Sequence, residues 1–138
     1  MKNLKKFLLI VGLPFLSISC LDDEPVHDNV TFHYKQIDSV HIEQINPIYQ
    51  VTKIKTFFTK NNSCEHFADY DYGIFGNIRH VTMITAKFND QACNEIVQVD
   101  SAYLNFRPEQ RGNYIFKFWA GNDENNEPIF IEKEIYIP

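Results

Sequence analysis

Apolar and polar residues alternate along most of the chain beyond residue 30, and this period of two constrains the fold more than any other feature. Residues 30–35 (VTFHYK) and 114–118 (YIFKF) are two clear examples. Successive side chains of a β-strand point to opposite faces, so this pattern is typical of strands that bury one face. No segment shows a convincing helical period. The sequence therefore predicts an all-β fold.

Seven β-type runs follow one another at short spacing. They cover residues 30–35, 40–43, 49–59, 78–88, 96–106, 113–120 and 128–137. Within 49–59 the alternation slips once, which suggests a β-bulge. Residues 60–77 are rich in Asn, Asp and Gly, and we expect them to form a long loop. Seven short strands without a helix are typical of a β-sandwich or barrel.

The segment before the sixth run favours the sandwich. Residues 110–114 (QRGNY) resemble the Asp-x-Gly-x-Tyr corner of immunoglobulin-like domains, with Gln110 in place of the usual Asp. In that family the tyrosine hydroxyl bonds back across the connection that precedes its strand. The resemblance implies an immunoglobulin-like antiparallel β-sandwich of about seven strands. Its last hairpin would join 113–120 to 128–137.

The first twenty residues have the organisation of an export signal. Lys2, Lys5 and Lys6 form a basic head, and the apolar stretch 7–16 is shorter than the roughly 20 residues of a bilayer span. Residues 16–20 (LSISC) resemble the lipobox of bacterial lipoproteins, although Ile18 is larger than the residue commonest at its position. The resemblance implies that Cys20 is lipidated and becomes the mature N-terminus. The alternative is a signal cut elsewhere, with Cys20 incidental.

An acidic cluster, residues 22–24 (DDE), follows this cysteine. At this position it resembles the signal that sends lipoproteins of the Bacteroidota type to the cell surface, and the alternative is a solvated tether. We expect residues 1–19 to be a signal peptide, 20–29 a lipidated cysteine and tether, and 30–138 one β-sandwich domain. The expected location is the outer membrane, exposed at the cell surface.

Net charge narrows the range of partners. Residues 1–19 hold three of the 13 Lys and Arg and none of the 18 Asp and Glu, so the remainder carries a net charge of −8 with neutral histidines. An acidic surface disfavours nucleic acid, anionic lipid and polyanionic glycans. We expect attachment to the membrane through the lipid anchor and a protein or glycan ligand, with no nucleic acid.

Two cysteines remain for the folded domain once Cys20 is lipidated. Cys64 and Cys93 form an even pair in an exported chain, and this favours a disulfide. Because His66 is close to Cys64 in sequence, a thiolate nucleophile is the catalytic alternative. The export signal favours the bridge.

Aromatic side chains are the first candidates for a binding surface. Tyr70 and Tyr72 lie in the expected long loop, and long loops with their own aromatic residues are often functional. The alternative is that Phe67, Tyr70 and Phe75 pack into the core and cap one end of the sandwich beside the disulfide. Trp119 should face outward if Phe116 and Phe118 face the core. It would then stack on a sugar ring or anchor a protein partner, and the alternative is packing under a neighbouring loop.

Two short motifs are candidate modification sites, and no motif indicates catalysis. Ser39 in Asp38-Ser39-Val40 and Ser101 in Asp100-Ser101-Ala102 resemble O-glycosylation sites of exported Bacteroidota-type proteins. Loop 121–127 is interpreted as a solvated turn rather than a calcium site, and the histidines do not form a convincing zinc set. The sequence contains no Gly-x-Ser-x-Gly, phosphate-loop or His-Glu-x-x-His motif. We expect no metal, no cofactor and no enzymatic activity.

These features together predict a non-enzymatic surface lipoprotein that acts as a binding or accessory module. The alternative is a structural component of a larger envelope complex, recognised through an unpaired sheet edge.

Overall fold

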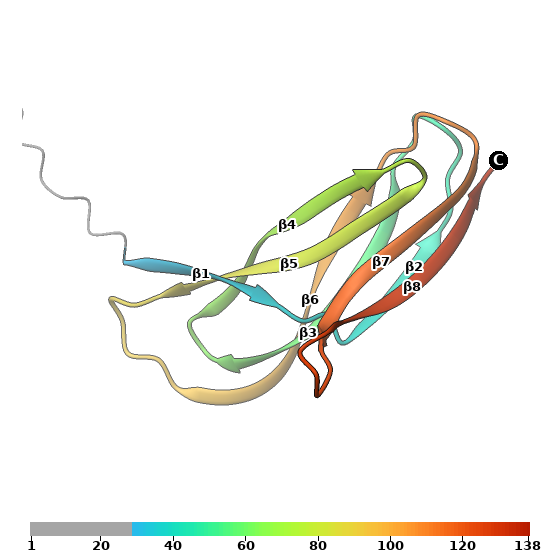
Figure 1. Ribbon diagram of the computed structural model, residues 1–138. Helices are drawn as coiled ribbons and strands as arrows, with labels where there is room; N and C mark the ends of the chain where they lie inside the picture. The colour runs from blue at the N-terminus through green and yellow to red at the C-terminus, as the bar shows by residue number, and fades with distance from the viewer. Residues whose placement is uncertain (1–28) are drawn as a thin grey trace, which may run out of the picture.

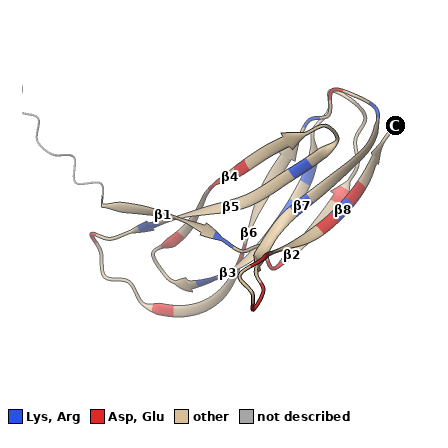
Figure 2. Ribbon diagram, in the orientation of Figure 1, with Lys and Arg blue, Asp and Glu red and all other residues tan. Residues whose placement is uncertain are grey.

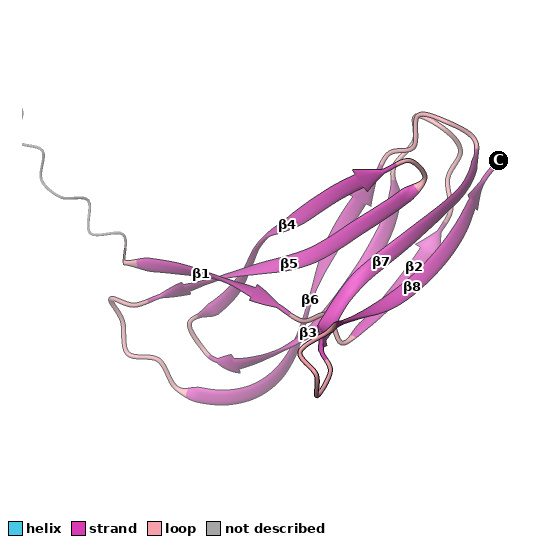
Figure 3. Ribbon diagram, viewed as in Figure 1, coloured by secondary structure: helices cyan, strands magenta, loops and turns pink. Residues whose placement is uncertain are grey.

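The computed structural model describes residues 29–138, and their regular structure consists entirely of β-strands (Figures 1 and 3). The strands are β1 (Val30–Lys35), β2 (Ser39–Gln44), β3 (Thr52–Asn62), β4 (Glu65–Phe75), β5 (Ile78–Phe88), β6 (Glu95–Phe106), β7 (Gly112–Asn122) and β8 (Pro128–Ile137). A five-stranded sheet contains β1, β4, β5, β7 and β8, and a three-stranded sheet contains β2, β3 and β6. The predicted all-β sandwich is confirmed. Among these residues, no helix has the length and apolar character that crossing a bilayer requires.

The five-stranded sheet is organised around β5. Strand β4 pairs antiparallel along nearly all of it. The opposite edge of β5 is shared, because β1 pairs with residues 83–88 and β7 runs parallel to residues 78–81. This parallel pair is a local departure from the antiparallel arrangement expected. Between β1 and β2 the chain crosses to the other sheet at Ile37, whose N–H donates to the Trp119 carbonyl at 3.0 Å.

Large apolar side chains from both sheets meet in one core. Strands β5, β7 and β8 contribute from the five-stranded sheet, and β3 and β6 contribute from the other. The Phe106 ring of β6 lies edge-on to Tyr114 and Phe116 of β7, with centroids 5.0 and 4.9 Å apart. Phe116 and Phe118 are fully buried, as the alternation predicted. Burial of each such ring stabilises the folded state by about 1.5–3 kcal/mol.

Strand β3 does not contain the bulge that was predicted within residues 49–59. Thr52, Ile54, Thr56 and Phe58 point inward in strict alternation, and the register with β6 shifts only beyond Lys60. The prediction was wrong because two of the inward positions are threonines. Their polarity interrupts the apolar pattern although both side chains are fully buried.

The expected long loop 60–77 is largely strand β4. Its inward positions are Phe67, Tyr70 and Tyr72, and the pairing register shifts between Phe67 and Asp69. One extra residue therefore separates the first two inward side chains, which hides the period of two. The strand then turns into β5 through only two residues, Gly76-Asn77. The structure has eight strands rather than about seven for this reason.

A chain of hydrogen bonds links the two sheets inside the sandwich. The Tyr70 and Thr56 hydroxyl oxygens are 2.6 Å apart, and Thr56 Oγ1 donates to the Ala102 carbonyl at 3.3 Å. Because the single Thr56 hydroxyl proton is used by Ala102, Tyr70 is the donor in the first bond. This arrangement joins β4 of one sheet to β3 and β6 of the other.

The predicted disulfide between Cys64 and Cys93 is present, with the two Cα atoms 5.5 Å apart. It connects the β3–β4 turn to the β5–β6 loop at one end of the sandwich. Lys35 and Glu65 form an ion pair at 3.0 Å between β1 and β4, and Thr85 donates to the same carboxylate at 3.0 Å. Covalent and polar contacts therefore close this end.

Removing the disulfide should destabilise the fold. The Cys64→Ser/Cys93→Ser double variant loses the constraint on the unfolded chain, and we expect its unfolding free energy to fall by about 2–5 kcal/mol. Urea unfolding followed by circular dichroism measures this change. Reduction of the wild-type protein should give the same loss. An unchanged unfolding midpoint in both would contradict the structural role of the bridge.

Tyr70 should make stability depend on alkaline pH. Burial raises the pKa of Tyr70 from 10.0 to about 12, and the hydrogen bond to Thr56 partly offsets this. Because the folded chain holds the phenol proton more tightly, the stabilisation is complete below pH 10 and is lost as pH rises through about 12. Urea unfolding should show a steeper fall across this range for the wild type than for Tyr70→Phe. An equal fall of the unfolding free energy with pH in both proteins would show that the Tyr70 proton does not contribute to the pH dependence of stability.

Candidate functional site

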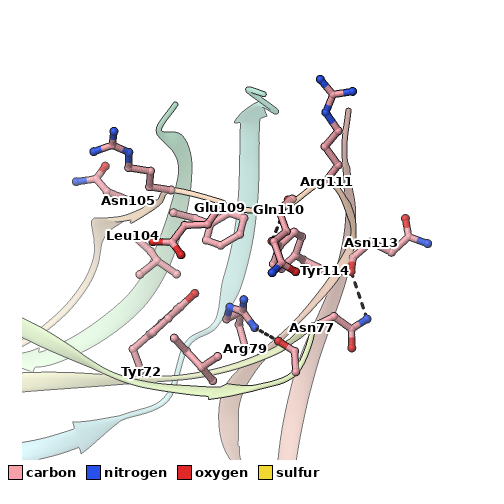
Figure 4. A pocket seen from close by; sticks show the side chains of 14 residues that line it. Tyr72, Asn77, Arg79, Leu104, Asn105, Glu109, Gln110, Arg111, Asn113 and Tyr114 are labelled. Atoms are coloured by element: carbon pink, nitrogen blue, oxygen red, sulfur yellow. Dashed lines mark hydrogen bonds between the residues drawn. The ribbon is translucent and has the colours of Figure 1, made fainter. Parts of the chain in front are cut away.

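A cleft of about 560 Å³ opens at the end of the sandwich opposite the start of β1 (Figures 1 and 4). One wall comes from the β4–β5 hairpin, and the other comes from the end of β6 and the connection to β7. Small-molecule sites in proteins commonly have volumes of about 300–1,000 Å³. The cleft therefore lies in the size range of small-molecule sites.

All three arginines of the chain line this cleft, and none of its lysines does. Arg79 comes from β5, whereas Arg107 and Arg111 flank the β6–β7 connection. Glu109 is the single carboxylate in the lining. Within residues 29–138 the ion pairs are all made by lysines, so no arginine there is paired with a carboxylate. The cleft is locally positive in a chain whose net charge is −5.

Arg79 is held in a fixed position inside the cleft. Its Nη1 donates to the carbonyls of Gly76 and Ile78 at 2.7 and 3.0 Å. Its guanidinium carbon lies 4.9 Å from the centroid of the Tyr114 ring, a cation–π geometry. Figure 4 shows Arg79 between Tyr72 and Tyr114. Burial raises the pKa of Tyr72, and the positive charge of Arg79 partly offsets this effect.

The corner that resembles immunoglobulin-like domains forms the second wall. The Tyr114 hydroxyl donates to the Gln110 carbonyl at 3.0 Å, which is the bond that the resemblance predicted. Gly112 has a φ of +122°, a backbone conformation that side-chain-bearing residues rarely adopt. These two features fix the course of the β6–β7 connection. They thereby place Arg107 and Arg111 on the cleft.

The two rim arginines differ from Arg79 in their exposure. Arg107 Nε donates to the Tyr49 carbonyl at 3.0 Å, and Arg107 is exposed. Arg111 is exposed, and in Figure 4 it extends away from the hollow at the rim. The cleft thus combines one guanidinium held inside it with two exposed positive charges at its rim.

Two hydrogen bonds connect the β4–β5 turn to β7. Asn77 Nδ2 donates to the Asn113 carbonyl at 3.2 Å, and the Ile115 N–H donates to the Asn77 carbonyl at 3.0 Å. These bonds tie the β4–β5 turn to β7, so the mouth of the cleft has a fixed width. Comparison with known proteins finds no matching family model, no curated protein and no solved structure.

The three aromatic residues predicted to form a binding surface do not lie together. Tyr70 and Tyr72 pack against the core from the inner face of β4, and only Tyr72 reaches the cleft. The alternative interpretation was right for Phe67 and Tyr70, which pack against the core, and wrong for Phe75, which is 65% exposed. Trp119 lies half-buried on β7, where its Nε1 donates to Asn122 at 3.1 Å. The placement of the tyrosines on an exposed loop was wrong. The sequence had not indicated that β4 continues through them.

The remaining candidate residues lie away from the cleft. Ser39 is exposed at the start of β2, and Ser101 is half-buried on β6. Cys64 is bonded to Cys93 and is therefore not a free thiol. In loop 121–127, Asp123 Oδ1 accepts from the N–H groups of Asn125 and Glu127 and so caps its own turn. Within residues 29–138, no three His, Cys, Asp or Glu side chains form a group that could hold a metal ion. Cys20 lies outside the described residues.

Sequence reasoning missed the arginines, although a signal was present. The chain has far fewer arginines than lysines, and two of the three stand four residues apart around the tyrosine corner. Arg79 could not be added to them, because residues 60–77 were expected to form a loop. Only the Gly76-Asn77 hairpin brings Arg79 to the same end as the other two.

Proposed function

We propose that this chain is a non-enzymatic binding module, attached to the outer membrane through lipid on Cys20 and exposed at the cell surface. Three features support this proposal. The first twenty residues have a basic head, an apolar stretch and a cysteine, and an acidic cluster follows them. The Cys64–Cys93 disulfide suits an oxidising compartment outside the cytosol.

The proposed activity is the binding of an anionic group in the arginine cleft. The convergence of all three arginines, unpaired by carboxylates, is the observation that carries this proposal. A guanidinium offers donors in a planar fork that matches a carboxylate or a phosphate. Arg79 supplies the fixed contact. Arg107 and Arg111 attract the ligand over a longer range, as exposed charges at a binding site do.

The composition of the lining favours binding over catalysis. The residues that line the cleft include no histidine, cysteine, serine or lysine, and Glu109 is their one carboxylate. General acid–base or nucleophilic catalysis commonly needs such a group beside a partner that activates it. The lining instead offers guanidinium groups, amides and phenol rings. These groups suit the recognition of a ligand.

Lipidation can be tested directly. We expect radiolabelled palmitate to appear on the wild-type protein and not on Cys20→Ser, because the thioether of Cys20 is the proposed attachment point. Cys93→Ser is the matched control and should keep the label. Label on Cys20→Ser, or none on the wild type, would exclude the proposed anchor.

Anion binding can be tested by NMR titration of the isotope-labelled protein with inorganic phosphate, sulfate and methyl glucuronide. We expect at least one probe to shift the amide resonances of Asn77 and Asn113, and Arg79→Gln to weaken its affinity at least tenfold. Arg111→Gln should mainly reduce the association rate and its salt dependence. Lys87→Gln, which removes one charge far from the cleft, should bind as the wild type does.

Two results would overturn the anion proposal. One is that no probe shifts the cleft resonances. The other is that the shifts persist unchanged in Arg79→Gln and in Arg111→Gln. The second variant keeps the test valid if Arg79→Gln proves to be unfolded.

A further inference from the structure

The β4–β5 hairpin has an outer face that the arginine cleft does not use. Tyr72, Ile74 and Arg79 line the cleft, whereas residues that alternate with them line a separate hollow of about 370 Å³. The lining of this hollow consists of Asp71, Gly73 and Phe75 of β4 and His80 and Thr82 of β5. Successive residues of a strand point to opposite faces, so the hollow lies on the side of the sheet away from the core. The two sites share a hairpin but no residue.

The pairing register brings the lining of the hollow together. Asp71 is opposite Thr82, and Gly73 is opposite His80, in the antiparallel pair of β4 and β5. Directly opposite residues share one face of a sheet and are close neighbours. The outer face of β4 and β5 therefore presents these side chains as one group.

Gly73 leaves the floor of the hollow open. A Cβ atom at residue 73 would lie 3.0 Å from Cε2 of Phe75, so the Phe75 ring leans along the strand toward Gly73. Glycine inside a strand often marks a place that another group approaches closely. On the other side of Gly73, Asp71 is roughly 7 Å away along the strand. The hollow thus has an aromatic ring at one end and a carboxylate at the other.

Exposed aromatic surface continues from the hollow across the sheet. The Phe75 and His80 rings lie edge-on with their centroids 5.3 Å apart, and the His80 and Phe130 rings lie edge-on at 5.6 Å. Phe75 is 65% exposed, so its ring adds little to the core. Aromatic side chains are enriched where proteins bind one another. This row of rings from β4 to β8 offers apolar contact area beside the hollow.

The carboxylate of the hollow is held in place but has no cation. The Tyr34 hydroxyl donates to Asp71 Oδ2 at 3.2 Å, and in the described part of the chain Asp71 makes no ion pair. Lys117 of β7, which is in register with His80, is already paired with Glu132 at 2.8 Å. Figure 2 shows acidic residues on β4 and on β8 of this sheet. The outer face therefore attracts a cation and repels an anion.

A flat cation suits both ends of the hollow. A guanidinium packs on an aromatic ring at about 4 Å and donates to a carboxylate at about 2.8 Å. These two distances together match the roughly 7 Å of strand between Gly73, where the Phe75 ring leans, and Asp71. An apolar side chain in the same position would exclude water from Asp71 without replacing its hydrogen bonds.

We infer that this hollow accepts an arginine side chain of a basic protein partner. The guanidinium lies between the Phe75 ring and the Asp71 carboxylate, and apolar residues around that arginine pack on His80 and Phe130. The net charge of −5 attracts a basic partner over a longer range. This site is independent of anion binding in the arginine cleft, so either proposal can fail alone.

The test uses peptides that differ only in their central residue. NMR titration of the isotope-labelled protein would compare blocked Gly-Ser-X-Ser-Gly peptides in which X is arginine, lysine, citrulline, glutamate or phenylalanine, with methyl glucoside as a sugar probe. Citrulline has the shape of arginine without its charge. We expect the arginine peptide to bind at least fivefold more tightly than every other probe. The shifted amide resonances should include Gly73 and Thr82.

Four results would overturn the inference. Citrulline binding as tightly as arginine would show that charge is not recognised, and equal binding of lysine would show that the flat guanidinium is not. Tightest binding of glutamate, phenylalanine or methyl glucoside would assign the hollow to another ligand. Shifts of the Gly73 and Thr82 resonances with protein concentration alone would show that a second copy of the chain occupies it.

Variants separate the charge contact from the ring contact. Asp71→Asn keeps an acceptor for the Tyr34 hydroxyl and should weaken binding of the arginine peptide at least fivefold. Its control is Asp90→Asn, an exposed carboxylate of the β5–β6 loop outside the hollow. Phe75→Leu should weaken the same binding at least threefold. Its control is Phe32→Leu, because Phe32 is also 65% exposed and does not line the hollow.

Both controls should bind the arginine peptide as the wild type does. Wild-type affinity in Asp71→Asn and in Phe75→Leu would overturn the assignment of these two contacts. The same result follows if the two control variants lose as much affinity as the two test variants, because binding would then depend on overall surface composition.

Discussion

Aromatic rings from facing sheets pack edge-on next to the cleft, and the rest of the structure depends on that contact. Phe106 of one sheet fits edge-on between Tyr114 and Phe116 of the other. Because β6 and β7 are consecutive in sequence, this contact also fixes the short connection between them. The same packing that holds the sandwich together thereby determines where Arg107 and Arg111 emerge.

The two ends of the sandwich are closed by different means. At one end, the Cys64–Cys93 disulfide joins the β3–β4 turn to the β5–β6 loop, and the Lys35–Glu65 ion pair joins β1 to β4. At the other end, the contacts are the hydrogen bond of the Tyr114 hydroxyl, the cation–π contact of Arg79 with Tyr114, and the hydrogen bond of the Asn77 side chain. Those groups leave space between the sheets. The end without a covalent link is therefore the one with room for a ligand.

How far the sequence predicts this structure differs from strand to strand. The runs at 78–88, 96–106 and 128–137 were found within a residue of their observed bounds, because apolar residues recur at alternate positions along most of each run. Strand β4 was missed since a bulge shifts its inward residues from Phe67 to Tyr70, and its polar outward residues resemble a loop. That single error concealed the hairpin that carries Arg79 to the other arginines. The tyrosine corner, by contrast, was recognisable from residues 110–114, because Gly112 permits the positive φ and the Tyr114 hydroxyl bonds back to Gln110.

The described chain begins at β1, at the end of the sandwich remote from the arginines (Figure 1). An anchor joined to that end would place the arginine cleft at the end of the domain that points away from the membrane. The cleft would then meet molecules that arrive from the medium, and its guanidinium groups would be kept away from the headgroups of the bilayer. Orientation alone would then help to choose the ligand.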